Sequence, residues 1–172
     1  DIARQGVHLL EFCGGGLTLE EYEAKGVAKQ EGLAGIATIP PLCVVDALGL
    51  NVVEVKENLE PIVWQQDHDS QLLQRCIPAG NVGGKRMNVE ISTEEGIAVN
   101  SCLEYRDFKP DEQEKLSWKV AGEPSMEITV VREVSHMASA SSLFNRVPDV
   151  LAAEPGIVEL WKYQPLRSSM FI

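Results

Sequence analysis

The chain has 172 residues, of which 44% are hydrophobic and 24% charged, and its formal net charge is −11. This length and composition fit one globular domain that can bury a continuous core. No apolar run approaches the roughly 18 residues that span a bilayer, and an acidic chain is a poor match for a phosphate backbone, so we expect neither a membrane nor a nucleic acid as partner.

Four cysteines, Cys13, Cys43, Cys76 and Cys102, lie far apart in the sequence, with no C-x-x-C pair and no histidine at zinc-ligand spacing. This arrangement predicts four separate thiols, buried or partly buried, and no metal site. Free thiols are usual in a reducing compartment, so we expect a cytoplasmic protein.

The first residues contain a glycine loop between two predicted elements. Gly6–Phe12 has strand character, and the loop 13–16 that follows leads to Thr18, which has Glu21 at capping-box spacing and predicts a helix. Glycines before a helix can approach a phosphate, but G-G-G lacks both the G-x-G-x-x-G of a dinucleotide fold and the lysine of a P-loop. A tight turn is the favoured interpretation.

Gly32–Gly49 forms a second predicted helix that is apolar nearly all round, which favours burial. The dipeptide Pro40-Pro41 predicts a break at Thr38 or Ile39 with a fresh start at Pro41. A glycine at the end of such a pattern, as at Gly49, is a stop signal.

A long strand, Asn51–Trp64, is predicted next, with Pro61 near an edge or bulge. The polar segment 65–71 contains His68 between two aspartates. A metal site is one interpretation, but adjacent side chains do not converge on one ion unaided, so a solvated loop is favoured. The segment 78–84 is predicted to be a flexible loop that ends at the cationic pair Lys85-Arg86, either a charged ligand site or two solubility residues.

The remaining sequence is rich in strand signals. A hairpin turn is predicted at 93–96 and another turn at 121–124. Four or five strands should form one mostly antiparallel sheet with an exposed or self-associating face, and 157–161 is a final strand or helix-edge segment. We therefore expect an α+β fold in a single domain, with a mixed, mostly antiparallel sheet and helices packed on one face. The predicted strands are 73–77, 86–92, 97–105, 115–120 and 126–131.

The stretch 134–156 joins the last of these strands to a closing helix. Ser135 is a candidate N-cap, His136 follows at the start of the helix, and Pro155-Gly156 is a stop signal. The unpaired N–H groups of a first helical turn favour an anionic ligand group near His136. The alternative is that His136 is only a surface or capping residue.

Several segments, in order, resemble the C-terminal domain of dihydrodipicolinate reductase-like dehydrogenases, in the branch of 2,4-diaminopentanoate dehydrogenase. They are Gly14–Tyr22, Glu31–Leu33, Val45–Leu50, Glu54, Glu57, Glu60–Val63, Ala79–Arg86, His136, Asn145, Pro148, Val150–Ala153 and Pro155-Gly156. The resemblance covers nearly the whole chain. It implies that residues 1–172 are one substrate-binding and oligomerisation domain, whose N-terminal Rossmann domain is absent here.

The resemblance also implies functional roles. The activity would be that of an NAD(P)-dependent amine or imine oxidoreductase acting on a small amino-acid-like substrate, in a homo-oligomer formed through the sheet. The chain has no Rossmann fingerprint, so we expect it to bind no cofactor alone and to use NAD(P) from a Rossmann domain or subunit. His136 would hold a substrate carboxylate or relay a proton. The predicted substrate-binding residues are Ser135, Ser139, Asn145, Lys85 and Arg86.

Two other functions are consistent with the residues. A fold that has lost its cofactor domain could act alone, as a small-molecule-binding protein or as a non-redox enzyme such as a cyclase or isomerase. A purely structural interaction module, in which His136 is a helix cap, is the third.

Overall fold

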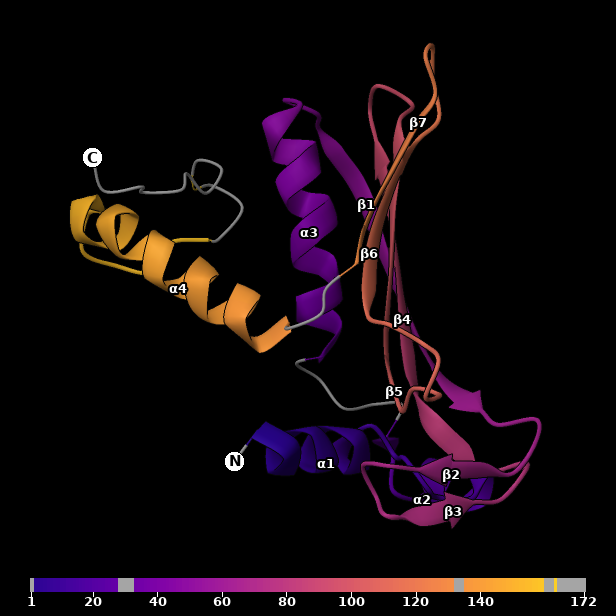
Figure 1. Cartoon of the computed structure of the whole chain (residues 1–172). Coiled ribbons are helices and arrows are strands. Elements are labelled where there is room, and N and C mark those ends of the chain that lie inside the picture. Colours follow the sequence, from indigo (N-terminus) through magenta and orange to yellow (C-terminus); the bar gives the residue numbers. More distant parts are fainter. Residues whose placement is uncertain (1, 28–32, 132–134, 160–162, 164–172) are drawn as a thin grey trace. The chain divides into compact units, whose positions relative to one another are not determined.

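The computed structural model describes residues 2–27, 33–131, 135–159 and 163, with the backbone alone at 2–5, 33–35 and 135–139. The chain divides between Lys109 and Pro110 into two compact units. The elements of the first unit are α1 (Ile2–Phe12), α2 (Leu19–Ala24), α3 (Leu33–Ala47), β1 (Val52–Val63), β2 (His68–Ser70), β3 (Arg75–Ile77), β4 (Val82–Thr93) and β5 (Ala98–Arg106). Those of the second are β6 (Lys115–Val120), β7 (Met126–Val131) and α4 (Ser135–Ala152) (Figure 1).

The first element is a helix, so the strand predicted at Gly6–Phe12 is wrong. Leu10 and Cys13 are buried at the end of α1, three positions apart, and Leu9 and Phe12 are exposed. That spacing is helical, and a short apolar run does not by itself distinguish a helix from a strand.

The capping box predicted for α2 is confirmed. The Thr18 hydroxyl accepts a hydrogen bond from the Glu21 amide at 3.2 Å, and the Glu21 carboxylate accepts one from the Thr18 amide at 2.9 Å. Glu21 therefore gains a hydrogen bond to its charged form, and the Thr18 amide lowers the pKa of this carboxyl. Tyr22 on this helix is buried.

Helix α3 runs unbroken through Pro40 and Pro41, so the predicted break is wrong. Each proline removes one backbone hydrogen bond, but Ala37, Pro41 and Val45 are buried along one side, and this packing holds the helix together. The predicted burial all round is also wrong, since Ile36 and Leu48 are exposed.

Gly49 ends α3 as predicted. It has a φ of 67°, its amide donates to the Asp46 carbonyl, and the Leu50 amide donates to the Val45 carbonyl. These are the two hydrogen bonds of a Schellman motif, in which glycine adopts the left-handed conformation without strain.

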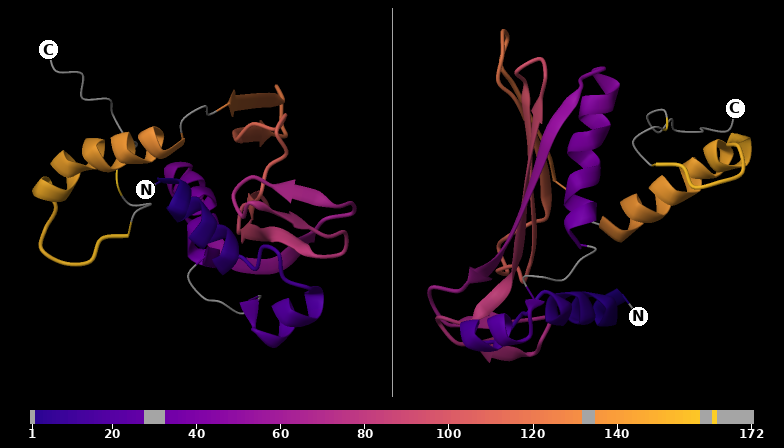
Figure 2. Two further views of the ribbon diagram at one scale, coloured as in Figure 1. Left: turned by 60° about the horizontal axis from the view of Figure 1, so that its bottom comes forward. Right: turned by 180° about the vertical axis from the view of Figure 1, so that it is seen from behind.

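Strands β1, β4 and β5 form the main sheet, in the order β1-β4-β5, with both ladders antiparallel. The alternation along β4 buries Met87, Val89 and Ile91 on one face, which α3 covers (Figures 1 and 2). Pro61 lies in β1, at the edge of the sheet, as predicted. An antiparallel sheet with a helix on one face confirms the predicted α+β class.

The other strands form two separate two-stranded sheets, β2-β3 and β6-β7, so the prediction of one sheet with four or five strands is wrong. After β5 ends at Arg106, the chain has no helix or strand from Asp107 through Glu114. In the first unit, α1, α2 and the β2-β3 hairpin lie at the end of the main sheet where β4 begins (Figure 1).

In the second unit, β6 and β7 have the predicted bounds and pair antiparallel across the predicted turn. Residues 157–159 are not in a strand, and the rest of the predicted final segment lies outside the described residues. No helix in the described part of the chain is long and apolar enough to cross a membrane.

Candidate functional site

Helix α4 contains four of the six predicted site residues. The first residue of the helix is Ser135, so His136 occupies the second position, and the N-cap role predicted for Ser135 stays a prediction. The side chains of Ser135, His136 and Ser139 lie outside the described residues, and their predicted roles therefore remain predictions. The backbone nevertheless places position 136 in a first helical turn, where N–H groups lack intrahelical partners.

Asn145 is in the same helix but on another side of it. An α-helix turns about 100° per residue, so the nine positions from 136 to 145 amount to about half a turn around the axis and about 13 Å along it. Asn145 is half-buried and already interacts with another residue of the chain. Positions 136 and 145 would therefore contact different parts of any ligand.

The flexible loop that was predicted to end at Lys85 is wrong at this point. Lys85 lies inside β4 and is fully buried. Its Nζ donates a hydrogen bond to the Val27 carbonyl oxygen at 2.5 Å. Burial lowers the pKa of this amine, and Cys13 opposes that shift. Lys85 is thus part of the interior of the first unit and contributes no charge to an open surface.

Arg86 lies on the opposite face of β4, half-buried. Its guanidinium donates to Glu104 at 2.7 Å and to Glu60 at 3.2 Å. These hydrogen bonds raise the pKa of Arg86. The two basic residues therefore do not form a shared cationic site, and the positive charge of Arg86 is balanced by two carboxylates.

The glycine loop after α1 is a tight turn, as favoured from the sequence. Its amides all donate to carbonyl oxygens of the chain, those of Gly14, Gly15 and Gly16 to Glu11, Leu10 and Val82. Ideal Cβ atoms on Gly14 and Gly15 would lie 2.6 Å from Tyr22 and Leu10, so the glycines permit close packing. An amide that is already engaged does not bind a phosphate, so this loop does not fit the phosphates of NAD(P).

His68 was predicted in a solvated loop, which is wrong. It begins β2, is buried, and its Nε2 lies 3.1 Å from an Oδ2 of the buried Asp107. The His68 ring stacks on Trp64 with centroids 4.0 Å apart. Within the described residues no group of three or more His, Cys, Asp or Glu side chains could hold a metal ion. The run His68-Asp69-Ser70 is polar throughout, so no hydrophobic pattern in the sequence indicated this burial.

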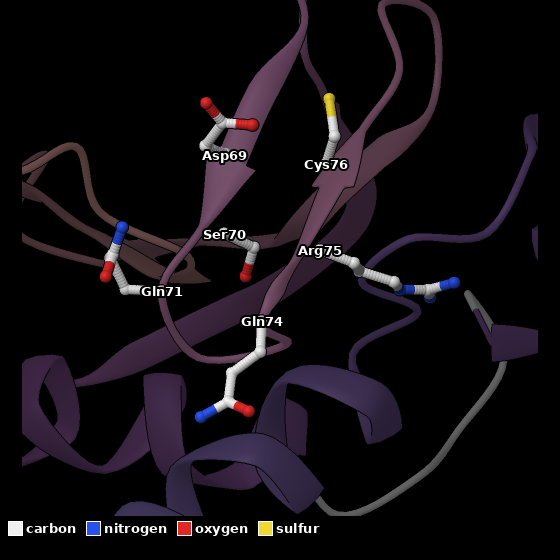
Figure 3. Close-up of a pocket in the computed structure, with 6 residues that line it drawn as sticks. All are labelled: Asp69, Ser70, Gln71, Gln74, Arg75 and Cys76. Carbon is white, nitrogen blue, oxygen red and sulfur yellow. The ribbon is translucent and has the colours of Figure 1, made fainter.

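A shallow depression of about 350 Å³ lies on the β2-β3 hairpin (Figure 3). The side chains that line it point away from one another, Gln71 to one side and Arg75 to the other, so they do not converge on one ligand. The lining residues are Asp69, Ser70, Gln71, Gln74, Arg75 and Cys76. This surface contains none of the predicted site residues.

The four cysteines are free thiols, as predicted, but they are not all buried. Cys13 is buried and Cys43 half-buried, and Cys76 and Cys102 are exposed. Burial raises the pKa of the Cys13 thiol, and the nearby Lys85 opposes the shift. A thiol with a raised pKa is a weak nucleophile at neutral pH.

Comparisons with known proteins show one similar structure and one matching family. No curated protein matches the sequence. In structure, the chain is similar to the amine dehydrogenase from Mycobacterium smegmatis, with a TM-score of 0.74 and 25% identity over 92% of this chain. The chain spans 47% of the length of that protein. The family model for the 2,4-diaminopentanoate dehydrogenase C-terminal domain matches residues 1–170, so the chain belongs to this family of dehydrogenase C-terminal domains.

Proposed function

We propose that this chain is the substrate-binding and oligomerisation half of an NAD(P)-dependent amine or imine oxidoreductase acting on a small amino-acid-like substrate. The observation that carries the proposal is the family match over residues 1–170. The likeness to 47% of an amine dehydrogenase supports it, because the remaining length of that protein leaves room for a cofactor domain.

His136 is the proposed catalytic residue. An imidazole titrates near neutral pH, so it suits a proton transfer that accompanies hydride transfer. Its place at the second residue of α4 adds the first-turn N–H groups, which favour a substrate carboxylate at the same point. Ser135 and Ser139 lie in the same first turns and are proposed to contact this substrate. Asn145 would contact it from the other side of the helix.

NAD(P) would come from a Rossmann domain or subunit. The chain has no strand followed by G-x-G-x-x-G, and the amides of the glycine loop 13–16 already donate to carbonyl oxygens of the chain. We therefore assign no residue of this chain to the cofactor.

Association through the main sheet is the second half of the proposal. One face of the sheet is covered by α3, and the other shows half-buried and exposed polar side chains such as Lys56, Asn88 and Glu90. Within the described part of the first unit, the sheet has a face that no helix covers and two edges, which offer surfaces for a second copy.

The test begins with intact and native mass measurements on the protein purified from its source. We expect a chain longer than 18.9 kDa or a second subunit, in a homo-oligomer that forms NAD(P)H from NAD(P)⁺ with a panel of small amines and diamines. An 18.9 kDa chain with a bound small molecule and no cofactor-dependent turnover would instead establish a standalone binding protein.

A further inference from the structure

Helix α4 exposes its large apolar side chains and covers polar ones. Leu143 and Leu151 are 75% and 81% exposed, and Phe144 is 62% exposed. A helix on the surface of a globular unit normally shows the opposite arrangement, with its apolar side turned inward. We call the exposed set the apolar stripe, and its members are Leu143, Phe144, Val147, Val150 and Leu151.

The polar side of α4 is covered by its own unit. Asn145, Arg146 and Asp149 are half-buried. Arg146 donates from Nη1 to Oδ2 of Asp149 at 2.7 Å, and its guanidinium carbon lies 5.2 Å from the centre of the Tyr163 ring. The segment after α4 turns back along the helix (Figures 1 and 2). The polar side is therefore occupied, and the apolar stripe is the side that is open to a partner.

The stripe is continuous and faces the same way as position 136. At about 100° per residue, its five positions fall within an arc of about 120°, and position 136 falls near the middle of that arc. Position 145 falls on the opposite side. The charged residues between 140 and 152 are Arg146 and Asp149, and neither belongs to the stripe. The helix side that contains position 136 is thus an uncharged apolar surface.

The length of the stripe indicates a protein partner. It extends about 12 Å from Leu143 to Leu151, and Leu151 is about 22 Å along the axis from position 136. A small amino-acid-like substrate at position 136 reaches only the nearest turns of the helix. An exposed apolar surface that continues beyond a ligand is typical of a contact with another domain or subunit.

The position of the proposed catalytic residue decides between two protein partners. In a twofold contact of two stripes, position 136 of each copy would lie against Leu151 of the other, which would close this surface to a cofactor. A cofactor domain on the stripe would instead bring the nicotinamide to position 136. The amine dehydrogenase that this chain resembles has the length for such a domain, because the chain spans 47% of it.

We propose that the apolar stripe of α4 is the docking surface for the Rossmann domain or subunit, and that this contact holds position 136 next to the nicotinamide. The inference rests on the proposed function and names the surface through which the cofactor domain and this chain join. A Rossmann domain binds its dinucleotide with its own residues, so the contact should support turnover rather than cofactor affinity.

A charge in the stripe of the full-length protein tests the contact. Leu151→Glu should lower kcat at least about tenfold, because docking would bury an unpaired carboxylate. The dissociation constant for NAD(P)H, measured by its fluorescence, should stay unchanged. Ala152→Glu is the matched control, since it adds the same charge at the next residue, which is exposed and outside the stripe. Leu151→Gln, which adds no charge, should cause a smaller loss in the same direction.

Hydrogen exchange on the same full-length variants reads the contact without turnover. The α4 amides at 147–151 should exchange at least about tenfold faster in Leu151→Glu than in the wild type or Ala152→Glu. Wild-type kcat and exchange in Leu151→Glu would overturn the docking surface and leave the proposed function intact. Loss of an oligomer in sedimentation with kcat unchanged would assign the stripe to a second copy and also overturn the proposal. A wild-type protein without NAD(P)-dependent turnover would overturn the proposed function and this inference together.

Discussion

Lys85 and Arg86 are adjacent in the chain but lie on opposite faces of β4. The Lys85 ammonium donates to the Val27 carbonyl inside the first unit, and the Arg86 guanidinium binds Glu60 and Glu104 on the uncovered face. The cause is the twofold alternation of a strand, which separates neighbouring side chains. A basic dipeptide therefore indicates a cationic patch only when it lies outside a strand.

Lys85→Met is expected to be tolerated or stabilising. Methionine has a similar length and carries no charge, so it removes the cost of burying an ionisable group; the Val27 carbonyl loses its donor, which costs about 1–3 kcal/mol and offsets that gain. Lys85→Ala, in contrast, should cost about 2–4 kcal/mol, because it leaves a cavity. Urea unfolding of the two variants and the wild type measures both effects. A large loss in Lys85→Met would show that the bond to Val27 dominates.

The same lysine predicts a pH dependence. Its folded-state pKa is lowered from the ordinary value of 10.5, so the folded chain binds fewer protons than the unfolded chain between the lowered value and 10.5. Through that alkaline window the stability of the wild type should rise relative to Lys85→Met. Below this window Lys85 is protonated in both the folded and the unfolded chain, so the stability difference between the two proteins does not change with pH. The measurement is the unfolding free energy of both proteins at pH 7 and at pH 9.5. The raised pKa of Cys13 makes stability fall with pH, but both proteins contain Cys13, so most of this effect cancels in the difference between them.

Gly83→Ala is expected to destabilise the first unit. A Cβ at this position would lie 2.2 Å from Nε1 of Trp64, and the indole is held by its stack on His68. Overpacking of this kind costs about 1–3 kcal/mol. Gly122→Ala is the matched control, because a Cβ there has no heavy atom within 4 Å, and it should change the unfolding free energy by less than about 0.5 kcal/mol. Equal effects at the two positions would contradict the packing argument.

Local signals predicted those elements whose causes are local. The capping box at Thr18 and the glycine stop at Gly49 each depend on a few adjacent residues, and both were found as predicted. Strands β6 and β7 have their predicted bounds, since a clear turn separates two runs of strand formers.

The features that the sequence did not predict depend on long-range packing. The burial of His68 depends on Asp107, which is remote in sequence, and the burial of Lys85 depends on α1, α2 and the segment ending at Val27. No pattern within a short window contains this information.

The His68–Asp107 pair should behave as a coupled unit. Removing one partner of a buried hydrogen bond leaves the other group unsatisfied, which costs about 1–3 kcal/mol and more for a charged group. His68→Phe retains the stack on Trp64 and should still be strongly destabilising, whereas adding Asp107→Leu should recover part of the loss. A double-mutant cycle in urea, followed by tryptophan fluorescence, measures the coupling. Additive effects would mean that the two side chains do not interact.

His136→Ala tests the proposed function most directly. If the imidazole relays the proton or holds the substrate carboxylate, kcat/KM for amine oxidation by the full-length protein should fall by about 10²–10⁴-fold, the range typical of a general acid or base. The melting temperature should change little, because alanine is a strong helix former and position 136 lies in the first turn of α4. Asn145→Ala is the control in the same helix. It lies about half a turn away, so it should lower kcat/KM far less. If His136→Ala folds normally and its turnover is unchanged, His136 has no catalytic role and is only a residue at the start of the helix. A loss that is equal in the two variants would point to the integrity of α4 rather than to the chemistry of the imidazole.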